Sequence, residues 1–425
     1  MPALYIGIDL GTSGCRAIAI DAGGDVHGHS AVSLPAPLRR AEAVEQNPQL
    51  WWQAVRDALH DLLNTVPAQQ VRAMAVDGTS ATLLLTDADG IPLGPALMYN
   101  DARGKAEAAR IAAIAPPDSA AHGATSALAK LLHLQQQPGM AHARHALHQA
   151  DWIAGKLSGH FGVSDENNCL KLGYDPVRRT WPEWLDSLGV RHEWLPEVVP
   201  PGTPIGTVTA DISREFGLPP ATRVVAGTTD SIAAFLATSA HEPGEAVTSL
   251  GSTLVLKIVS PQPVFAPAYG IYSHRLGDLW LAGGASNSGG AVLRQFFSQQ
   301  QINSMTPLLQ PDQPTGLDYY PLPTPGERFP ECDPALAPRL TPRPPDDALF
   351  FQGILESIAR IEKRGYQRLA GLGAPYPLSL RTTGGGASNT AWTRIRGDLL
   401  GVPMLEARQQ DAAYGTALLA CRGDM

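Results

Sequence analysis

Two short stretches, one near the start of the chain and one near its middle, place glycine and hydroxyl side chains between apolar segments. Residues 11–14 read Gly-Thr-Ser-Gly, and residues 251–253 read Gly-Ser-Thr. Successive backbone N–H groups and hydroxyls in such turns form a concave donor site that suits phosphate oxygens. Gly11 and Gly14 let the backbone adopt left-handed angles and approach a ligand closely. Either stretch alone also fits an ordinary hairpin, whereas the recurrence predicts nucleotide binding.

Two aspartates accompany these turns and supply the groups that phosphoryl transfer needs. Asp9 lies just before the first turn, where it would repel phosphate unless a cation lies between them, and this predicts Mg²⁺. Asp230 follows an apolar strand within Gly-Thr-Thr-Asp-Ser. A carboxylate near Mg²⁺ and polyphosphate is the usual base, so we expect Asp230 to accept the proton of an attacking hydroxyl. The alternative is a plain helix N-cap, for which aspartate is also typical.

Two glycine-rich loops in the second half of the chain are candidates for the nucleoside. Residues 283–290 and 384–389 each follow an apolar strand. Their glycines would let a flat base lie against the backbone, with Asn389 at the base or ribose edge and Trp392 as an apolar wall. Tight turns without a ligand remain the alternative.

Polar residues in the first half are candidates for an acceptor site. Ser80 follows the apolar strand 71–77, and ligands of α/β proteins gather at the carboxyl ends of strands. Glu45 and Gln46 form a polar pair on an expected loop, where a solvated loop without function is the alternative.

Recognisable helices and strands must position these residues. Apolar strands flank both hydroxyl turns. Helical spacing over residues 49–65 places Trp52, Val55 and Leu59 on one face. Residues 105–157 read as helix broken at prolines, which puts His142, His145 and His148 on a solvated helix face, with a metal site as the weaker alternative. A long helix is expected over 346–372, a strand over 378–383, and a small-residue helix over 412–420 that packs closely on a sheet.

Composition restricts the class of protein. The 425 residues, 44% apolar and 17% charged, predict two or three globular domains. A net charge of −8 argues against nucleic acid or an anionic membrane as partner, and no apolar run is long enough to span a bilayer. The four cysteines are far apart and read as free thiols. We expect a cytoplasmic protein, or a plastid protein if the chain is from a plant, although it contains no transit peptide.

Five motifs taken together resemble the FGGY family of carbohydrate kinases over nearly the whole chain. They are residues 7–13, 227–231, 249–253, 283–290 and 384–389. The resemblance implies an α/β fold with two actin-like (ribonuclease H-like) ATPase domains and a cleft between them. Residues 1–237 would form the N-terminal, sugar-binding domain, and residues 238–409 the C-terminal, nucleotide-binding domain. The C-terminal helix at about 410–425 would pack back onto the first domain.

The resemblance also implies roles for individual residues, with ATP and Mg²⁺ as cofactors and a monomer or homodimer as the assembly. Asp230 matches the catalytic base, and Asp9 and Asp230 the carboxylates near the metal. The substrate-binding candidates are Asp9, Ser80, Asp230, Glu45 and Gln46. The nucleotide-binding candidates are Gly11, Thr12, Ser13, Gly251, Ser252, Thr253, Gly290, Gly385, Gly386, Asn389 and Trp392.

Within the family, the chain looks similar to the short plant and cyanobacterial xylulokinase-like branch that acts on D-ribulose, on the basis of residues 77–80, 226–235 and 316–323. Glycerol kinases place an Arg-Glu pair after the strand that here ends in Gly78-Thr79-Ser80, and the absence of that pair argues against glycerol. The expected reaction is phosphorylation of D-ribulose to D-ribulose 5-phosphate, with D-xylulose as the alternative substrate. The alternatives from another class are a non-catalytic actin-fold ATP-binding protein and a sugar-independent ATPase.

Overall fold

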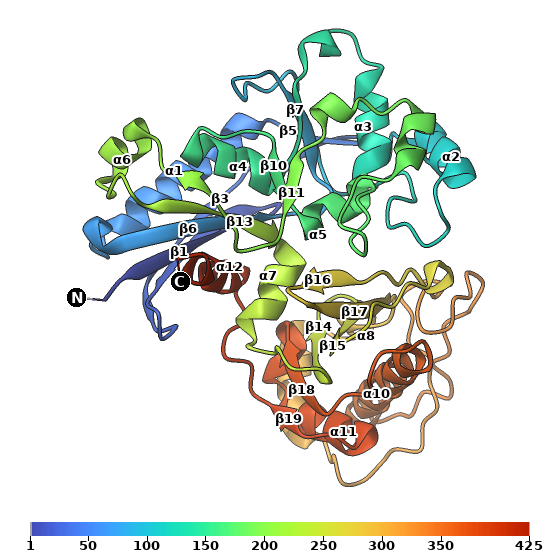
Figure 1. Ribbon diagram of the computed structural model, residues 1–425. Coiled ribbons are helices and arrows are strands. Elements are labelled where there is room, and N and C mark those ends of the chain that lie inside the picture. The colour runs from blue at the N-terminus through green and yellow to red at the C-terminus, as the bar shows by residue number, and fades with distance from the viewer. Residues whose placement is uncertain (1, 425) are drawn as a thin grey trace. The chain divides into compact units, whose positions relative to one another are not determined.

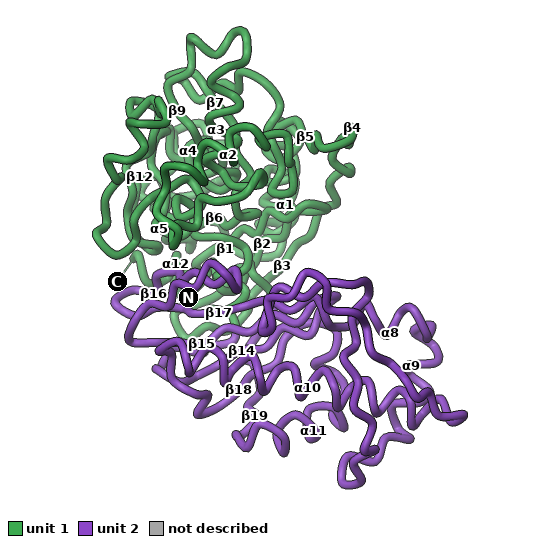
Figure 2. Tube along the Cα trace, turned by 90° about the vertical axis from the view of Figure 1, so that its right-hand side faces the viewer, with its two compact units in different colours: residues 1–237, 411–425 green, residues 238–410 purple. Residues whose placement is uncertain are grey.

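The computed structural model describes residues 2–424, and the chain divides into two compact units (Figure 2). Unit 1 comprises Met1–Ala237 and Asp411–Met425, and unit 2 comprises Thr238–Gln410. Each unit contains a six-stranded sheet that carries helices. The predicted two-domain α/β class is confirmed.

The main sheet of unit 1 has the strand order β12-β13-β6-β1-β2-β3 (Figure 1). The central strands β13, β6 and β1 run parallel, and β2, β3 and β12 are antiparallel to their neighbours. The carboxyl ends of the three parallel strands therefore meet at one edge of the sheet. The strands are β1 (Leu4–Leu10), β2 (Gly14–Ile20), β3 (Val26–Ser33), β6 (Val71–Gly78), β12 (Pro204–Thr207) and β13 (Arg223–Thr229).

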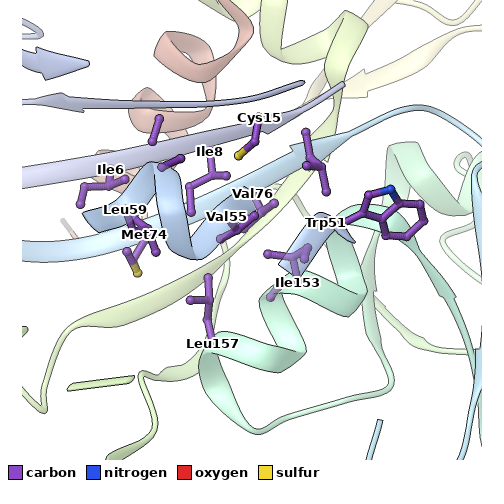
Figure 3. Close-up of a cluster of buried hydrophobic side chains, with 14 of the residues drawn as sticks. Ile6, Ile8, Cys15, Trp51, Val55, Leu59, Met74, Val76, Ile153 and Leu157 are labelled. Carbon is purple, nitrogen blue, oxygen red and sulfur yellow. The ribbon is translucent and has the colours of Figure 1, made fainter. Parts of the chain in front are cut away.

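One face of this sheet is covered by α1 (Pro48–Leu63) and α4 (Gln149–Ser158), which form the core drawn in Figure 3. Ile6 and Ile8 of β1 point into this core. Helix α1 begins where its sequence signals predict, because the Asn47 side chain accepts a hydrogen bond from the Gln49 N–H ahead of the first turn. The fully buried tryptophan of α1 is Trp51, whereas Trp52 packs at the margin of the core.

The opposite face of the sheet is covered by α12 (Ala412–Arg422) and α7 (Asp230–Ala237). A Cβ atom on Gly7 would lie 2.0 Å from the Ala413 carbonyl oxygen, and one on Gly415 would lie 1.9 Å from that of Ala233. These glycines permit backbone approaches that any side chain would block. The expected small-residue helix therefore lies directly on β1, and the last residues of the chain are part of unit 1.

A second, five-stranded sheet in unit 1 has the order β4-β5-β8-β7-β9 and packs with α2 (Lys105–Ile114) and α3 (Ala127–Gln135). The strands are β4 (Leu38–Arg40), β5 (Ala43–Gln46), β7 (Leu83–Thr86), β8 (Ala96–Leu97) and β9 (His145–His148). The predicted helical run over 105–157 is wrong where β9 lies, because these residues pair with β7. His145 and His148 are therefore strand residues, and His148 is buried.

Shorter elements complete unit 1. A two-stranded parallel sheet joins β10 (Val163–Asp165) to β11 (Glu197–Val199), and the short helices are α5 (Glu166–Cys169) and α6 (Ala210–Phe216).

The sheet of unit 2 has the order β16-β17-β15-β14-β18-β19. Its core is built on α10 (Asp347–Gly371), and both α10 and β18 confirm the predicted helix over 346–372 and strand over 378–383. The strands are β14 (Glu245–Leu250), β15 (Leu254–Ser260), β16 (His274–Leu276), β17 (Leu279–Ser286), β18 (Ser379–Thr383) and β19 (Met404–Leu405). The other helices are α8 (Gly290–Phe296), α9 (Gln299–Met305) and α11 (Thr390–Leu400).

A buried ion pair ties α10 to α11 in unit 2. Arg396 donates to both carboxylate oxygens of Glu362, at 2.6 and 2.7 Å, and both side chains are fully buried. Thr248 of β14 donates a further hydrogen bond to Glu362. The pair therefore connects the central strand to two helices.

Two further predictions concern the whole described chain. The four cysteines are free, as expected. Among residues 2–424, no helix is long and apolar enough to cross a membrane.

Candidate functional site

Two carboxyl groups end two neighbouring strands of unit 1. Asp9 of β1 and Asp77 of β6 are paired residues across the parallel strands. Both lie on the face that α12 covers, where the Thr416 hydroxyl donates a hydrogen bond to Asp77. Asp9 is buried and Asp77 fully so. The predicted site residue Asp9 thus has a second carboxyl group beside it.

Burial dominates the electrostatics of this pair. It raises the pKa of Asp77 well above its ordinary value, and the neighbouring charges of Asp9 and Asp230 raise that pKa further. Burial also raises the pKa of Asp9, while hydrogen bonds to Asp77 and Arg16 oppose the rise. The Arg16 guanidinium lies 3.0 Å from the Asp9 carboxylate. Two carboxyl groups can share a hydrogen bond only when one holds the proton, and we assign that proton to Asp77.

Asp230 is the first residue of α7, directly after β13. Its carboxylate accepts a hydrogen bond of 2.6 Å from the N–H of Ser231, the next residue in α7. Its charge also acts on Asp77. The structure therefore gathers Asp9, Asp77 and Asp230 at the carboxyl ends of the three parallel strands.

Asp77 was not among the predicted site residues. It stands at the end of an apolar strand in the same way as Asp9 does, and this shared position was the available signal. The register of β1 against β6, which no local pattern reveals, is what brings the two groups together.

The first hydroxyl turn joins β1 to β2 as predicted, and the side chains of Thr12 and Ser13 are at least partly exposed. Neither Gly11 nor Gly14 uses the left-handed angles that glycine allows, because neither residue has a positive φ. Gly14 is required for a different reason. A Cβ atom there would lie 2.9 Å from the Val32 carbonyl oxygen on the neighbouring strand β3.

The second hydroxyl turn, between β14 and β15, is held against the start of α8. The Gly290 and Ala291 N–H groups donate to the carbonyls of Gly251 and Ser252, at 2.9 and 3.1 Å. Arg294 of α8 donates to the Ser252 hydroxyl at 2.6 Å. Thr253 directly follows these residues in the same turn. The structure thus places a cation, Arg294, beside the predicted phosphate turn, although no sequence motif singled it out.

A cavity of about 580 Å³ opens beside this turn, entirely within unit 2. Its lining brings together most of the predicted nucleotide-binding residues of the second half, namely Gly251, Ser252, Gly290, Gly385, Gly386, Asn389 and Trp392. The other walls come from α9 and α10, including Ile302, Phe351 and Leu355. The lining thus combines apolar walls with polar side chains such as Arg294 and Asn303, a mixture that suits a nucleoside and its phosphates.

Two residues of this cavity are also tied into the scaffold. The Asn389 side-chain oxygen accepts a hydrogen bond of 2.9 Å from the Trp392 N–H and so caps α11. The Trp392 indole donates to the Leu355 carbonyl at 3.0 Å and is buried. The Asn389 oxygen is therefore engaged by the protein, while Trp392 forms a fixed wall.

The predicted acceptor-site residues separate into two places. Ser80 lies in the turn that follows β6 and is therefore close in sequence to Asp77. Glu45 and Gln46 lie in β5 of the five-stranded sheet, so the expected loop is wrong. Glu45 pairs with Arg103 at 2.7 Å.

Gln46 is engaged in the scaffold through both its side-chain oxygen and its side-chain nitrogen. Its oxygen accepts a hydrogen bond from the Trp51 indole at 2.7 Å, and its amide donates to the Pro35 carbonyl at 2.8 Å. It is buried, and it anchors the chain ahead of α1. Through these contacts Gln46 stabilises the local structure.

Comparison with known proteins agrees with this architecture. Residues 4–237 match the N-terminal domain of the FGGY family of carbohydrate kinases, and residues 246–423 match its C-terminal domain. A xylulose kinase of Staphylococcus epidermidis is 23% identical over 446 residues, which cover 99% of this chain and 88% of that protein. An autoinducer-2 kinase of Yersinia pseudotuberculosis is 27% identical over 462 residues, which cover 97% of this chain and 84% of that protein.

A solved structure, described as a xyloylose kinase from Brucella ovis, has a TM-score of 0.89 to this chain at 24% identity. The match covers 99% of this chain and 90% of that one. The likeness extends over both units and concerns the fold.

Proposed function

The chain belongs to the FGGY family of carbohydrate kinases and is a phosphotransferase acting on a sugar hydroxyl, and we propose that it converts D-ribulose to D-ribulose 5-phosphate with ATP. The observation that carries the proposed phosphoryl transfer is the position of Asp230 directly after β13, at the same edge of the sheet as Asp77 of β6 and Asp9 of β1. In this reaction Asp230 accepts the proton of the primary hydroxyl as its oxygen attacks the γ-phosphorus.

The nucleotide is assigned to unit 2. The cavity beside β14 would hold the adenosine, with Gly385, Gly386 and Trp392 in its walls. Gly251-Ser252-Thr253 would bind phosphate oxygens. Arg294 is close enough to the Ser252 hydroxyl to supply positive charge there. Residues 11–14 of unit 1 would contribute further N–H and hydroxyl donors to the phosphates.

The residues present fit Mg²⁺ bound mainly through substrate. Among residues 2–424, no three metal-ligating side chains are placed to hold an ion by themselves. Mg²⁺ in phosphoryl-transfer sites usually keeps waters and phosphate oxygens and takes only one or two carboxylates. Asp9 and Asp230 would supply those carboxylates. When bound, the ion offsets negative charge on the β- and γ-phosphates.

The choice of a ketopentose depends on the turn after β6. Thr79, Ser80 and Ala81 carry short side chains where glycerol kinases carry an Arg-Glu pair, which leaves room for a longer acceptor. Ser80 would donate to or accept from a sugar hydroxyl. D-xylulose is the second candidate, because relatives over almost the whole chain are described as xylulose kinases.

The test is ADP release with Mg²⁺ and ATP against D-ribulose, D-xylulose, L-ribulose, glycerol, gluconate and autoinducer-2. We expect D-ribulose to give the highest kcat/KM, and Asp230→Ala to lower kcat by about 10³-fold or more. Ser231→Ala is the matched control at the neighbouring position, since it removes a hydroxyl and keeps the carboxylate.

The possible outcomes separate the alternatives. A highest kcat/KM with D-xylulose would replace D-ribulose as the substrate and leave the mechanism intact. ADP release that no sugar stimulates would identify a sugar-independent ATPase. ATP binding without turnover in any condition would favour a non-catalytic nucleotide-binding protein.

A further inference from the structure

Lys130 of α3 is a fully buried lysine whose ammonium group is surrounded by backbone carbonyls. It donates to the carbonyl oxygens of Ala81, Tyr99 and Thr125, at 2.8, 3.2 and 2.8 Å. An ammonium has three N–H donors, so these three partners use all of them. The contacts join three segments that are far apart in the sequence.

Stability alone does not account for this arrangement. An ammonium loses its hydration on burial, and three neutral carbonyls compensate for that loss less well than a carboxylate does. Burial lowers the pKa of Lys130 to about 7, and the charge of Asp101 only partly opposes this fall. An apolar side chain on α3 would fill the space without this penalty but would release the three segments.

One of these segments is the turn that carries Ser80. On its other side, the Gln149 side-chain oxygen accepts hydrogen bonds from the Thr79 N–H and hydroxyl, at 3.0 and 2.8 Å. Ala81 has a φ of +66°, an unfavourable angle for a residue with a Cβ. Such strain persists where surrounding contacts determine the backbone. Ser80 is therefore held between two fixed neighbours.

The second segment leads to Asn100. Lys130 bonds the carbonyl of Tyr99, and Asn100 follows with a buried side-chain oxygen that has no hydrogen-bond partner among the described residues. Because one ammonium contacts both Ala81 and Tyr99, the turns carrying Ser80 and Asn100 are neighbours.

We propose that Lys130 is a positioning residue that sets the affinity for the sugar by clamping the Ser80 turn against the Tyr99–Asn100 turn, an inference that depends on the proposed role of Ser80 in sugar binding. Lys130 does not contact substrate in this scheme. It acts through the backbone of Ala81 and Tyr99.

The test compares Lys130→Met with the wild-type chain. Methionine keeps the length and helix propensity of the side chain and removes all three donors. We expect the sugar KM to rise by about tenfold, the effect of losing one neutral hydrogen bond between Ser80 and the sugar, while the Kd of ATP stays within about twofold. Leu131→Ala is the control, because Leu131 is an equally buried neighbour in α3. It should lower Tm and leave the sugar KM within about twofold.

A double-mutant cycle tests whether Lys130 changes the sugar KM through Ser80. If Lys130 acts through Ser80, Lys130→Met should raise the sugar KM much less in a Ser80→Ala background than in the wild type. Equal effects in both backgrounds would overturn the proposal, as would an equal rise in sugar KM for Lys130→Met and Leu131→Ala.

Hydrogen exchange tests the clamp independently of the substrate. Lys130→Met should increase amide exchange at residues 78–82 and 99–101 more than Leu131→Ala does at matched Tm. Unchanged protection there would overturn the clamp even if no sugar proved to be a substrate. Increased exchange together with no sugar-dependent turnover would instead reject the proposed function and retain the clamp. Should Lys130→Met fail to fold, Lys130→Gln, with two N–H donors, takes its place in each measurement.

Discussion

Asp9 and Asp77 are direct partners across the parallel strands β1 and β6, so two carboxyl groups lie side by side in a buried part of unit 1. Asp77 holds a proton because burial and the charges of Asp9 and Asp230 raise its pKa. The unfolded chain loses that proton at a much lower pH. Between the pKa of Asp77 in the unfolded chain and its raised pKa in the native state, the native state therefore binds more protons. The contribution of Asp77 to stability falls as pH rises through that range.

Asp77→Asn should accordingly stabilise the protein at pH 7 to 8. The asparagine oxygen can accept the hydrogen bond of Thr416, and its amide can donate toward Asp9 without a titrating proton. We expect an increase of about 1 kcal/mol or more in the free energy of unfolding, seen as a higher Tm. Asp77→Ala, which leaves the Thr416 hydroxyl without its partner, should lower Tm. A lower Tm in Asp77→Asn as well would show that Asp77 is ionised in the native state.

Asp165 gives a second prediction, in which pH is the variable. It is the buried N-cap residue of α5, and burial raises its pKa from 3.8 to about 7. Between these values the unfolded chain has lost the proton and the native chain keeps it, so this group destabilises the fold as pH rises from about 4 to about 7. Asp165→Asn removes the titration. The free energy of unfolding of Asp165→Asn, relative to that of the wild type, should increase by about 2 kcal/mol or more between pH 4 and pH 7 and then level off.

The neighbourhood of Asp165 can accommodate this substitution. The Asn168 amide now donates to Asp165 at 2.6 Å, and its own oxygen has no partner among the described residues. A rotation of the Asn168 amide would present that oxygen to the new asparagine N–H. Urea unfolding at several pH values measures the effect, with the exposed Asp118→Asn as control. A pH-independent difference between Asp165→Asn and wild type would contradict the prediction.

Local sequence signals predicted much of the fold because they act over short distances. Asn47 and Pro48 defined the start of α1, and the apolar segments around each hydroxyl turn defined the two hairpins. The failure over residues 105–157 has a tertiary cause. His145–His148 pairs with β7, and that pairing outweighs the helical character of the surrounding segments.

The candidate site was predictable only where a motif carries its own chemistry. Asp9, Asp230 and the glycine loops were visible as motifs, whereas Asp77 and Lys130 matter through partners distant in sequence. Gln46 shows the converse case. Its polarity suggested a ligand, but Trp51 and Pro35 use its hydrogen-bonding groups within the scaffold.

The buried pair of Glu362 and Arg396 supports a third prediction, on the stability of unit 2. Arg396→Met would leave the Glu362 carboxylate buried without its cation, which should cost about 3–5 kcal/mol. Arg394 lies on the same helix in an exposed pair with Asp312, so Arg394→Met should cost less than about 1 kcal/mol. Calorimetry of the two variants measures the contrast. Equal losses of Tm in the two variants would show that burial of the Glu362–Arg396 pair makes no extra contribution to stability.

The last prediction tests the nucleotide cavity with two adjacent glycines. A Cβ atom on Gly386 would lie 2.6 Å from the Trp392 ring and 2.8 Å from the Leu250 Cβ, whereas one on Gly385 would meet nothing within 4 Å. Gly386→Ala should therefore disturb the protein itself and lower Tm. Gly385→Ala should fold normally, because its new methyl group projects into open space.

Both glycines line the cavity. If the adenosine lies there, the methyl group of Gly385→Ala meets the ligand, and we expect the Kd of ATP to rise about tenfold with Tm unchanged. Gly371→Ala is the matched control, because its Cβ also meets nothing within 4 Å and Gly371 is not part of the lining. Titration calorimetry with a non-hydrolysable ATP analogue measures the affinities. A wild-type Kd in Gly385→Ala would place the base elsewhere, because a ligand packed against this backbone cannot be indifferent to an added methyl group.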